Sequence, residues 1–223
     1  GLAPVHFTLN TAGLGFSLSG YFWDSLTGAA AVGLTNVVVK FENQASLGVF
    51  MTGSYNLSTG IWTMVDVAAG TYNVHFTATG YATQVTTLVV SGNLTGWKIG
   101  VSAVLPTNTY RAVLTWDLEP RDLDTYVYYP DLMEVVSFEH KVGKDSKVIL
   151  DLDDRDGEGP ETCTIKMDLP QGEAYHYVVY NYSKTPDLSV SSGMVVIYYG
   201  NSAIHTINVN TAESGIYWHV FDL

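Results

Sequence analysis

The sequence predicts an all-β protein of two tandem antiparallel β-sandwiches with a detached N-terminal strand. Tyr, Thr, Val, Ser and Gly are abundant while only 14% of the residues are charged, a composition typical of extended strands joined by turns. No window of about ten residues shows the 3.6-residue apolar period of a helix. With 223 residues, 47% of them hydrophobic, the chain is long enough to bury two cores.

Charge is distributed unevenly along the chain. The net charge is −12, but residues 1–110 contain only three acids and two bases, so residues 111–223 carry almost all of it. This change of composition predicts a domain boundary near residue 107. The expected units are an N-terminal strand with a hinge, a first sandwich and a second, acidic sandwich, at residues 1–15, 16–106 and 107–223. Neither half contains a basic stripe that could neutralise phosphates, so nucleic acid is not expected as a partner.

The detached strand is predicted at residues 3–10, where apolar and polar side chains alternate strictly. Val5, Phe7 and Leu9 fall on one face. Two glycines at positions 13 and 15 then interrupt the pattern before the next strand begins. Such a strand either closes an edge of its own domain or completes the sheet of a neighbouring copy, as in donor-strand assemblies. The sequence leaves both fates open.

The first sandwich is predicted from short strands separated by turn residues. The strands are expected at residues 16–23, 35–42, 60–67, 73–79, 82–90 and 97–105.

Several strings in this region resemble the carboxypeptidase regulatory-like domain. They are residues 19–28, the strand Val37–Val39, the string Ala69-Gly70-Thr71-Tyr72 and the string Ala78-Thr79-Gly80-Tyr81. That family is a seven-stranded prealbumin-type sandwich, common as a module in secreted and surface proteins. Its members are non-catalytic spacers or interaction modules. The resemblance covers roughly residues 16–105 and implies a fold and a location, not an activity.

The second sandwich is expected to contain eight strands. They are predicted at residues 110–116, 125–129, 146–152, 162–169, 174–182, 189–199, 202–209 and 215–221. The single cysteine, Cys163, excludes an internal disulfide. It lies in an alternating run, so we expect a small buried side chain on a strand.

The most unusual stretch is residues 150–161, which places six carboxylates around Arg155. Like charges this close repel by about 0.5–1 kcal/mol per exposed pair, so a tight turn that gathers them needs a cation. Ca²⁺ is the ion that prefers flexible loops of carboxylates and carbonyls. The spacing is not that of an EF-hand, because a ligand position falls on Arg155 and the position of the bidentate glutamate falls on Thr162.

A calcium site is therefore predicted here, with a solvated acidic loop as the alternative. Two further aspartates on one face of their own segment, at positions 122 and 124, are the best long-range partners. On a strand, Asp151 and Asp153 should share a face while Asp154 points away, so not all of the acids can bind one ion. The candidate ligands are Asp122, Asp124, Asp151, Asp153, Asp154, Asp156 and Glu161.

The second half also resembles a known family. The relevant strings are Leu114-Thr115-Trp116, Asp122-Leu123-Asp124, Pro130, residues 150–154 and Gly159-Pro160-Glu161. They resemble the YfaP-like family, a little-characterised β-sandwich domain of bacterial and some eukaryotic secreted proteins. The resemblance spans roughly residues 110–223.

The chain departs from that family at two places. Thr125-Tyr126 stands where a Leu-His-like pair is expected, and Glu158 replaces the usual aromatic residue before Gly159. The departures remove a possible histidine and add a carboxylate. Because no catalytic activity is established for the family, the resemblance implies a fold and a secreted location.

Catalytic chemistry is not predicted. Glycosidases use paired carboxylates, but their acid needs an apolar pocket that raises its pKa, and this loop is hydrophilic and crowded. No nucleophile elbow or phosphate-binding glycine loop is present. The histidines show no zinc-ligand spacing; they are His6, His75, His140, His176, His205 and His219. The pairs Tyr198-Tyr199 and Tyr217-Trp218 are expected to pack cores and rims, with carbohydrate binding through them left open.

Several features fit a secreted or cell-surface glycoprotein. No apolar run approaches the roughly 18–20 residues needed to cross a bilayer. The chain opens on Gly1 without an initiator Met, as a mature secreted protein or a trimmed chain would. Asn56, Asn93 and Asn181 each begin an N-glycosylation sequon.

Two functional hypotheses follow. The favoured one is a non-catalytic structural subunit of an extracellular fibre or surface assembly, which polymerises with copies of itself by exchange of residues 3–10 and is stabilised by Ca²⁺. The alternative is a secreted surface module that binds glycans or proteins, which predicts exposed aromatic side chains gathered on one face.

Overall fold

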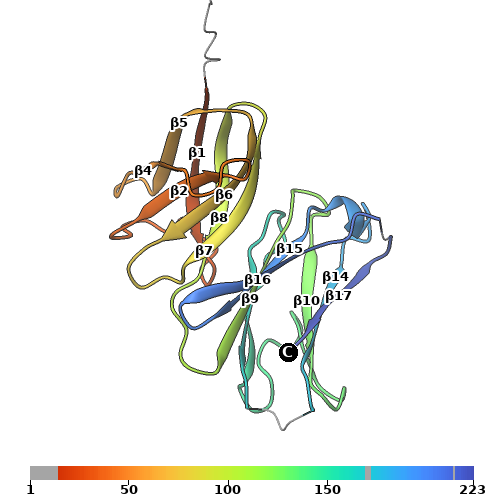
Figure 1. The fold of residues 1–223 in the computed structure, drawn as a ribbon. Coiled ribbons are helices and arrows are strands. Elements are labelled where there is room, and N and C mark those ends of the chain that lie inside the picture. The colour runs from red at the N-terminus through yellow and green to blue at the C-terminus, as the bar shows by residue number, and fades with distance from the viewer. Residues whose placement is uncertain (1–14, 169–171, 213) are drawn as a thin grey trace, which may run out of the picture.

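Both domains are built from strands whose alternate side chains enter a core, because every second residue of a strand points to the same face of its sheet. Two sandwiches follow one another along the chain, at the upper left and the lower right of Figure 1. The structure is a computed structural model that describes residues 15–168, 172–212 and 214–223. The prediction of an all-β protein with two β-sandwiches is confirmed.

The first domain has two four-stranded sheets, with strand orders β4-β5-β1-β8 and β3-β2-β6-β7. Its strands are β1 (Phe16–Asp24), β2 (Val38–Asn43), β3 (Phe50–Thr52), β4 (Ser54–Tyr55), β5 (Ile61–Val67), β6 (Gly70–Thr77), β7 (Gln84–Val90) and β8 (Leu94–Val101). Aromatic side chains fill the space between the sheets. Phe22, Phe41, Trp62 and Phe76 are each at most 1% exposed, and the rings of Phe22 and Phe76 lie 4.3 Å apart.

One strand pair in this domain departs from the antiparallel prediction. β1 pairs with β5 in the antiparallel sense and with β8 in the parallel sense. The first and last strands of the domain therefore lie side by side and run in the same direction. The strands β2 to β7 lie between them in the sequence and provide the long connection that a parallel pair needs, because such a pair cannot be joined by a tight hairpin.

The second domain pairs a four-stranded sheet, β11-β10-β14-β17, with a five-stranded sheet, β12-β13-β9-β15-β16. The strands are β9 (Thr109–Thr115), β10 (Leu123–Tyr128), β11 (Val135–Val136), β12 (Val148–Leu152), β13 (Glu161–Lys166), β14 (His176–Asn181), β15 (Met194–Tyr199), β16 (Ser202–Asn208) and β17 (Tyr217–Asp222). Its core includes Leu114, Leu123 and Val179. Cys163 is buried in this core and unpaired, as expected.

A third buried cluster joins the domains. Ala82 and Leu105 pack there against Val113, Val196 and Tyr198 of the second domain. The hydroxyl of Tyr198 lies 2.6 Å from Oε1 of Gln84 and 3.1 Å from the carbonyl oxygen of Gly100. The predicted boundary near residue 107 falls in the segment between β8 and β9.

The predicted strand at residues 189–199 is too long. Residues Leu188–Val190 form a short 3₁₀ turn, and β15 begins only at Met194. Asp187 caps the turn by accepting a hydrogen bond from the Ser189 N–H at 2.9 Å. A capping aspartate offers the backbone an alternative to sheet pairing, and this ends the predicted strand early.

The predicted assembly strand, with Val5, Phe7 and Leu9, lies outside the described residues. Gly15 is described, and a side chain there would overlap the backbone of Asp66. This close approach of two backbones accounts for a glycine at position 15. Among the described residues, no helix has the length and apolar character needed to cross a membrane.

Candidate metal centre

Four acidic side chains from both sheets of the second domain form what we call the carboxylate cluster. Asp122 and Asp124 flank Leu123, the first residue of β10 in the four-stranded sheet. Asp153 follows the last residue of β12, and Glu161 is the first residue of β13, both in the five-stranded sheet. Ligand oxygens of Asp124, Asp153 and Glu161 lie within 4.8 Å of one another. The cluster therefore connects the two sheets.

Each acid in the carboxylate cluster has an enclosed oxygen without a hydrogen-bond partner among the described residues. These atoms are Asp122 Oδ1, Asp124 Oδ2, Asp153 Oδ1 and Glu161 Oε2. The second oxygen of two of the acids is occupied. The N–H of Thr125 donates to Glu161 Oε1 at 2.5 Å, and Lys141 Nζ lies 2.9 Å from Asp153 Oδ2. An enclosed acceptor without a partner costs about 1–3 kcal/mol, and more when it is charged, so four such oxygens in one place require a compensating group.

The electrostatics of the carboxylate cluster favour protonation unless a cation is bound. Glu161 is fully buried and Asp124 is 2% exposed. Burial, followed by repulsion from Asp122 and Asp153, raises the pKa of Asp124 to about 7. Burial also raises the pKa of Glu161 well above its usual range and raises the pKa of Asp122, with the charge of Asp153 adding to the effect.

The donor set fits a hard divalent cation. All four groups are carboxylates, and Ca²⁺ takes six to eight oxygen ligands in flexible geometry, whereas Zn²⁺ in proteins prefers nitrogen and sulfur ligands. The positive charge of the ion would offset the repulsion that the burial of several acids creates. Glu161 and Asp124 would contribute from fixed strands, and Asp153 from the start of the loop.

The remaining predicted ligands lie elsewhere. Asp151 accepts a hydrogen bond from the Thr164 hydroxyl at 2.6 Å. The predicted common face of Asp151 and Asp153 is wrong, because the pairing of β12 with β13 shifts register between Leu150 and Leu152. Such a bulge interrupts the alternation of side chains along a strand.

Two acids of the loop make local contacts instead. Asp156, whose side chain is 83% exposed, forms an ion pair with Arg121 at 2.8 Å. Asp154 accepts a hydrogen bond from the N–H of Asp156 at 3.4 Å, and burial raises its pKa. The structure thus brings oxygens of three of the seven predicted ligands, Asp124, Asp153 and Glu161, within 4.8 Å of one another. Asp122 is near enough to raise the pKa of Asp124.

The three sequons differ in accessibility. Asn56 and Asn93 are exposed. Asn181 is fully buried, and its Nδ2 donates to the carbonyl oxygen of Pro186 at 2.7 Å. Glycosylation would have to modify this same nitrogen, so Asn181 is not available for a glycan in the folded chain.

The aromatic pairs singled out in the sequence also separate. Tyr198 is buried at the domain junction, and Trp218 packs against the second core. Tyr217 is 66% exposed and stacks on Tyr180, with ring centroids 4.8 Å apart. Tyr198 and Trp218 thus do not share a face with Tyr217, whose ring belongs to a set of contacts that links Tyr180 to Tyr126 and Tyr182.

A second group of possible ligands was missed in the sequence. Asp222 Oδ1 lies 2.7 Å from His176 Nδ1 and 2.8 Å from His219 Nε2. The pairing of β14 with β17 places His176 opposite Asp222, a neighbourhood that sequence spacing alone does not reveal. Both histidines already bond to one carboxylate, which lowers the pKa of Asp222.

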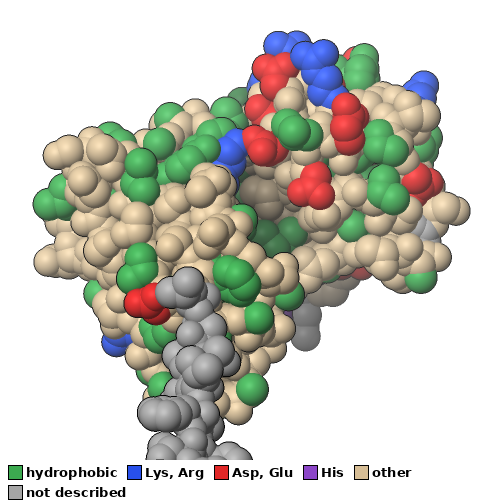
Figure 2. All heavy atoms as spheres, turned by 90° about the horizontal axis from the view of Figure 1, so that it is seen from above, with side chains coloured by type: hydrophobic (Ala, Val, Ile, Leu, Met, Phe, Trp, Pro, Cys, Tyr) green, Lys and Arg blue, Asp and Glu red, His purple; other side chains and the backbone are tan. Residues whose placement is uncertain are grey.

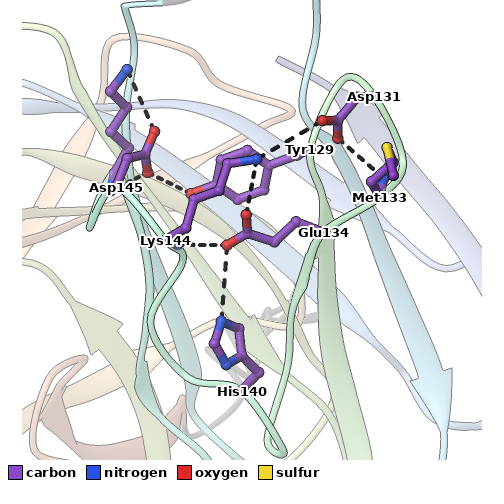
Figure 3. Close-up of polar contacts among 8 residues, drawn as sticks. Tyr129, Asp131, Met133, Glu134, His140, Lys144 and Asp145 are labelled. Atoms are coloured by element: carbon purple, nitrogen blue, oxygen red, sulfur yellow. Dashed lines mark hydrogen bonds and ion pairs between the residues drawn. The ribbon is translucent and has the colours of Figure 1, made fainter.

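A polar network around Tyr129 shows the usual outcome for acids in this protein (Figure 3). The ammonium of Lys144 lies 5.4 Å from the centre of the Tyr129 ring, 3.2 Å from Glu134 and 3.9 Å from Asp131. The hydroxyl of Tyr129 donates to Asp145 at 2.7 Å. Each acid of this network has a donor or a cation, whereas the carboxylate cluster has enclosed oxygens without either.

Comparisons with known proteins give distant structural similarity only. No family model matches the chain, and no curated protein matches it. A proposed carbohydrate-binding protein from Bacteroides uniformis is 14% identical with a TM-score of 0.36, over 95% of this chain and 99% of that one. DUF3823 family proteins from Bacteroides ovatus and Parabacteroides merdae are 11% and 10% identical, with TM-scores of 0.34 and 0.30. Both alignments cover 93% of this chain, and they cover 97% and 98% of the other chains respectively.

Proposed function

We propose that this chain is a non-catalytic extracellular protein whose second domain binds Ca²⁺ through the carboxylate cluster. The proposal depends on one observation, the four enclosed carboxylate oxygens that have no partner among the described residues. An ion at this place would connect β10 of one sheet with β12 and β13 of the other. Calcium would then stabilise the packing of the two sheets of the second sandwich against each other.

A non-catalytic role fits the placement of the acids. The cluster is enclosed, with Glu161 fully buried, so a substrate has no direct access to its carboxylates. The exposed acids of the loop are already engaged, as the Arg121–Asp156 ion pair shows. A secreted location fits the role, because extracellular fluids supply calcium at the concentrations that sites of modest affinity need.

The first prediction concerns stability in calcium. An ion that binds only the folded state adds about 2.7 kcal/mol to the free energy of unfolding at a hundredfold excess over Kd. Thermal unfolding of protein freed of metal and then supplied with Ca²⁺ should therefore show a clear rise in Tm. Chelation should reverse the rise. Identical melting curves with Ca²⁺ and with chelator would refute the site.

Two variants test whether the calcium-dependent rise in Tm arises at the carboxylate cluster. Glu161→Gln keeps the shape of the side chain and the acceptor for the Thr125 N–H, but removes the charge. It should abolish most of the calcium-dependent rise in Tm. Asp156→Asn is the matched control, since it removes an exposed charge from the same loop outside the cluster. Equal loss of calcium response in both variants would mean that the loop attracts calcium only as a diffuse charge.

Assembly by exchange of residues 3–10 is a second candidate function. A sheet edge supports it, although Thr83, just before this edge strand, is bridged to Ser202 of the second domain. β7 pairs with β6 alone in its sheet, and Val85 and Val89 on that strand are 50% and 69% exposed. An unpaired edge with exposed apolar side chains is a template for an incoming strand.

Electron microscopy tests this candidate directly. The full chain should form fibres under negative stain, and a chain beginning at Phe16 should remain monomeric. Val5→Asp combined with Phe7→Asp should abolish fibres without lowering Tm, because the changes leave both described sandwiches intact. Compact particles from the full chain, or fibres from the double variant, would exclude strand exchange.

A further inference from the structure

A groove lies between the two domains, beside the loop that carries Glu158. Its volume is about 360 Å³, within the range of about 300–1,000 Å³ that small-molecule sites occupy. Residues of β8 and Trp23 form the wall on the first domain, and residues after β9 with Met194 of β15 form the opposite wall. Figure 2 shows this hollow between the two lobes, with acidic side chains gathered on one side of it.

Three indole rings line the groove: Trp23, Trp97 and Trp116. Trp97 packs edge-on against the fully buried ring of Trp62, with centroids 5.8 Å apart and an interplanar angle of 85°. This support fixes the orientation of its ring. Rigid aromatic surfaces suit ligands with an apolar face, such as the C–H face of a sugar ring.

The groove also has hydrogen-bonding capacity that the chain does not use. The indole N–H groups of Trp23 and Trp116 have no acceptor among the described residues. Both nitrogens are enclosed, so the exposed polar side chains of the lining, Ser192 and Asp117, are the groups that can bond to a ligand with several hydroxyls.

The charges of the lining disfavour a charged ligand. Lys98 pairs with Glu158 across the domain junction, and its ammonium lies 4.1 Å from the centre of the Trp23 ring. It thereby occupies the position that a cationic ligand would take over this ring. Asp117 accepts a hydrogen bond from the Ser192 hydroxyl at 2.6 Å and leaves the lining with a surplus negative charge, which repels anions.

From these contacts we propose that the groove binds a neutral saccharide. Trp97 would stack on the apolar face of the sugar, and Ser192 and Asp117 would bond to its hydroxyls. This inference goes beyond calcium binding and rests on it only through the stability of the second domain. The groove lining includes no member of the carboxylate cluster, so the two sites can be tested separately.

The test is calorimetric titration of the calcium-loaded full chain with neutral glucose-, mannose-, galactose- and xylose-based trisaccharides. At least one should bind and change tryptophan fluorescence. Trp97→Ala should weaken this binding at least tenfold. Tyr217→Ala is the control, because Tyr217 is an aromatic side chain outside the groove lining and is more exposed than the partly buried Trp97; it should leave affinity unchanged.

A second variant covers the case in which Trp97→Ala disturbs the core next to Trp62. Thr95→Arg places a bulky side chain at an exposed position of the groove and should block binding while Tm stays unchanged. No binding of any neutral trisaccharide, or binding lost in Tyr217→Ala but retained in Thr95→Arg, would overturn the proposal. Tighter binding of acidic than of neutral sugars would overturn the neutral assignment. Melting curves of the same samples report calcium binding, so the failure of one site is distinguishable from the failure of the other.

Discussion

Glu161 is the most constrained acid in the described chain. It is fully buried, one oxygen accepts the N–H of Thr125, and the other has no partner. Without a cation, burial raises the pKa of this carboxyl well above its usual range and so favours its protonated form. With a cation, the same burial excludes water and strengthens the interaction with the ion. We therefore expect the protonation of Glu161 to differ between the metal-free and the calcium-bound protein.

The pH dependence of stability follows from Asp124. Its pKa is about 7 in the folded chain without metal and about 3.9 when unfolded. The folded pKa is the higher one, so the folded state binds the proton more tightly. That stabilisation is complete below about pH 4 and is lost as the pH rises through 7. The free energy of unfolding of metal-free protein should therefore fall between pH 5 and pH 8 in urea titrations.

Calcium and one substitution provide the controls for this pH dependence. Calcium affinity should rise over the same interval, because the ion needs deprotonated carboxylates. Asp124→Asn should flatten the profile of the metal-free protein. A metal-free profile that rises from pH 5 to pH 8 in the unmodified chain would contradict the assignment.

At the scale of elements, β1 depends on a glycine in its interior. Gly20 lies between Trp62 of β5 and Trp97 of β8 in the sheet. A side chain there would overlap the backbone oxygen of Trp97 and lie 2.7 Å from the ring of Trp62. A glycine inside a strand commonly marks such a close approach. The pairing of β1 with β8 and the packing of the first core therefore both require that residue 20 has no side chain.

Substitution of this glycine tests that requirement. Gly20→Ala should lower the free energy of unfolding by about 1–3 kcal/mol through overpacking, measured by urea denaturation. Gly92→Ala is the matched control, because a side chain at Gly92 meets no atom within 4 Å. It should change stability by less than about 0.5 kcal/mol. Equal effects of the two variants would show that backbone entropy, not the close approach, governs Gly20.

Element patterns explain what could be predicted from the sequence. A long strand with regular alternation, such as β6, is expected from local residues alone. Very short strands such as β3 (Phe50–Thr52) contain too few residues for a period to be recognised. The ligand pair that flanks Leu123 follows from alternation, whereas the bulge at Asp151 depends on pairing with a distant strand and could not be anticipated.

At the scale of the whole molecule, the functional surfaces arise where distant segments meet. The groove needs Trp23, Lys98 and Glu158 together, and these residues come from both domains. Their proximity depends on the buried junction around Tyr198. No local pattern in the sequence encodes it. The carboxylate cluster could be predicted in part because Asp153 and Glu161 lie in one acidic stretch and Asp122 and Asp124 flank Leu123.

The parallel pairing of β1 with β8 has a mechanical consequence. The chain enters the domain at the start of β1 and leaves it at the end of β8, and these are opposite ends of two adjacent strands that run in the same direction. Tension along the chain therefore pulls the two strands past each other lengthwise. All hydrogen bonds of the ladder then share the load at once, whereas the bonds of a hairpin pulled from its open end break one after another. The first domain is thus arranged as a shear clamp that can transmit tensile force to the second.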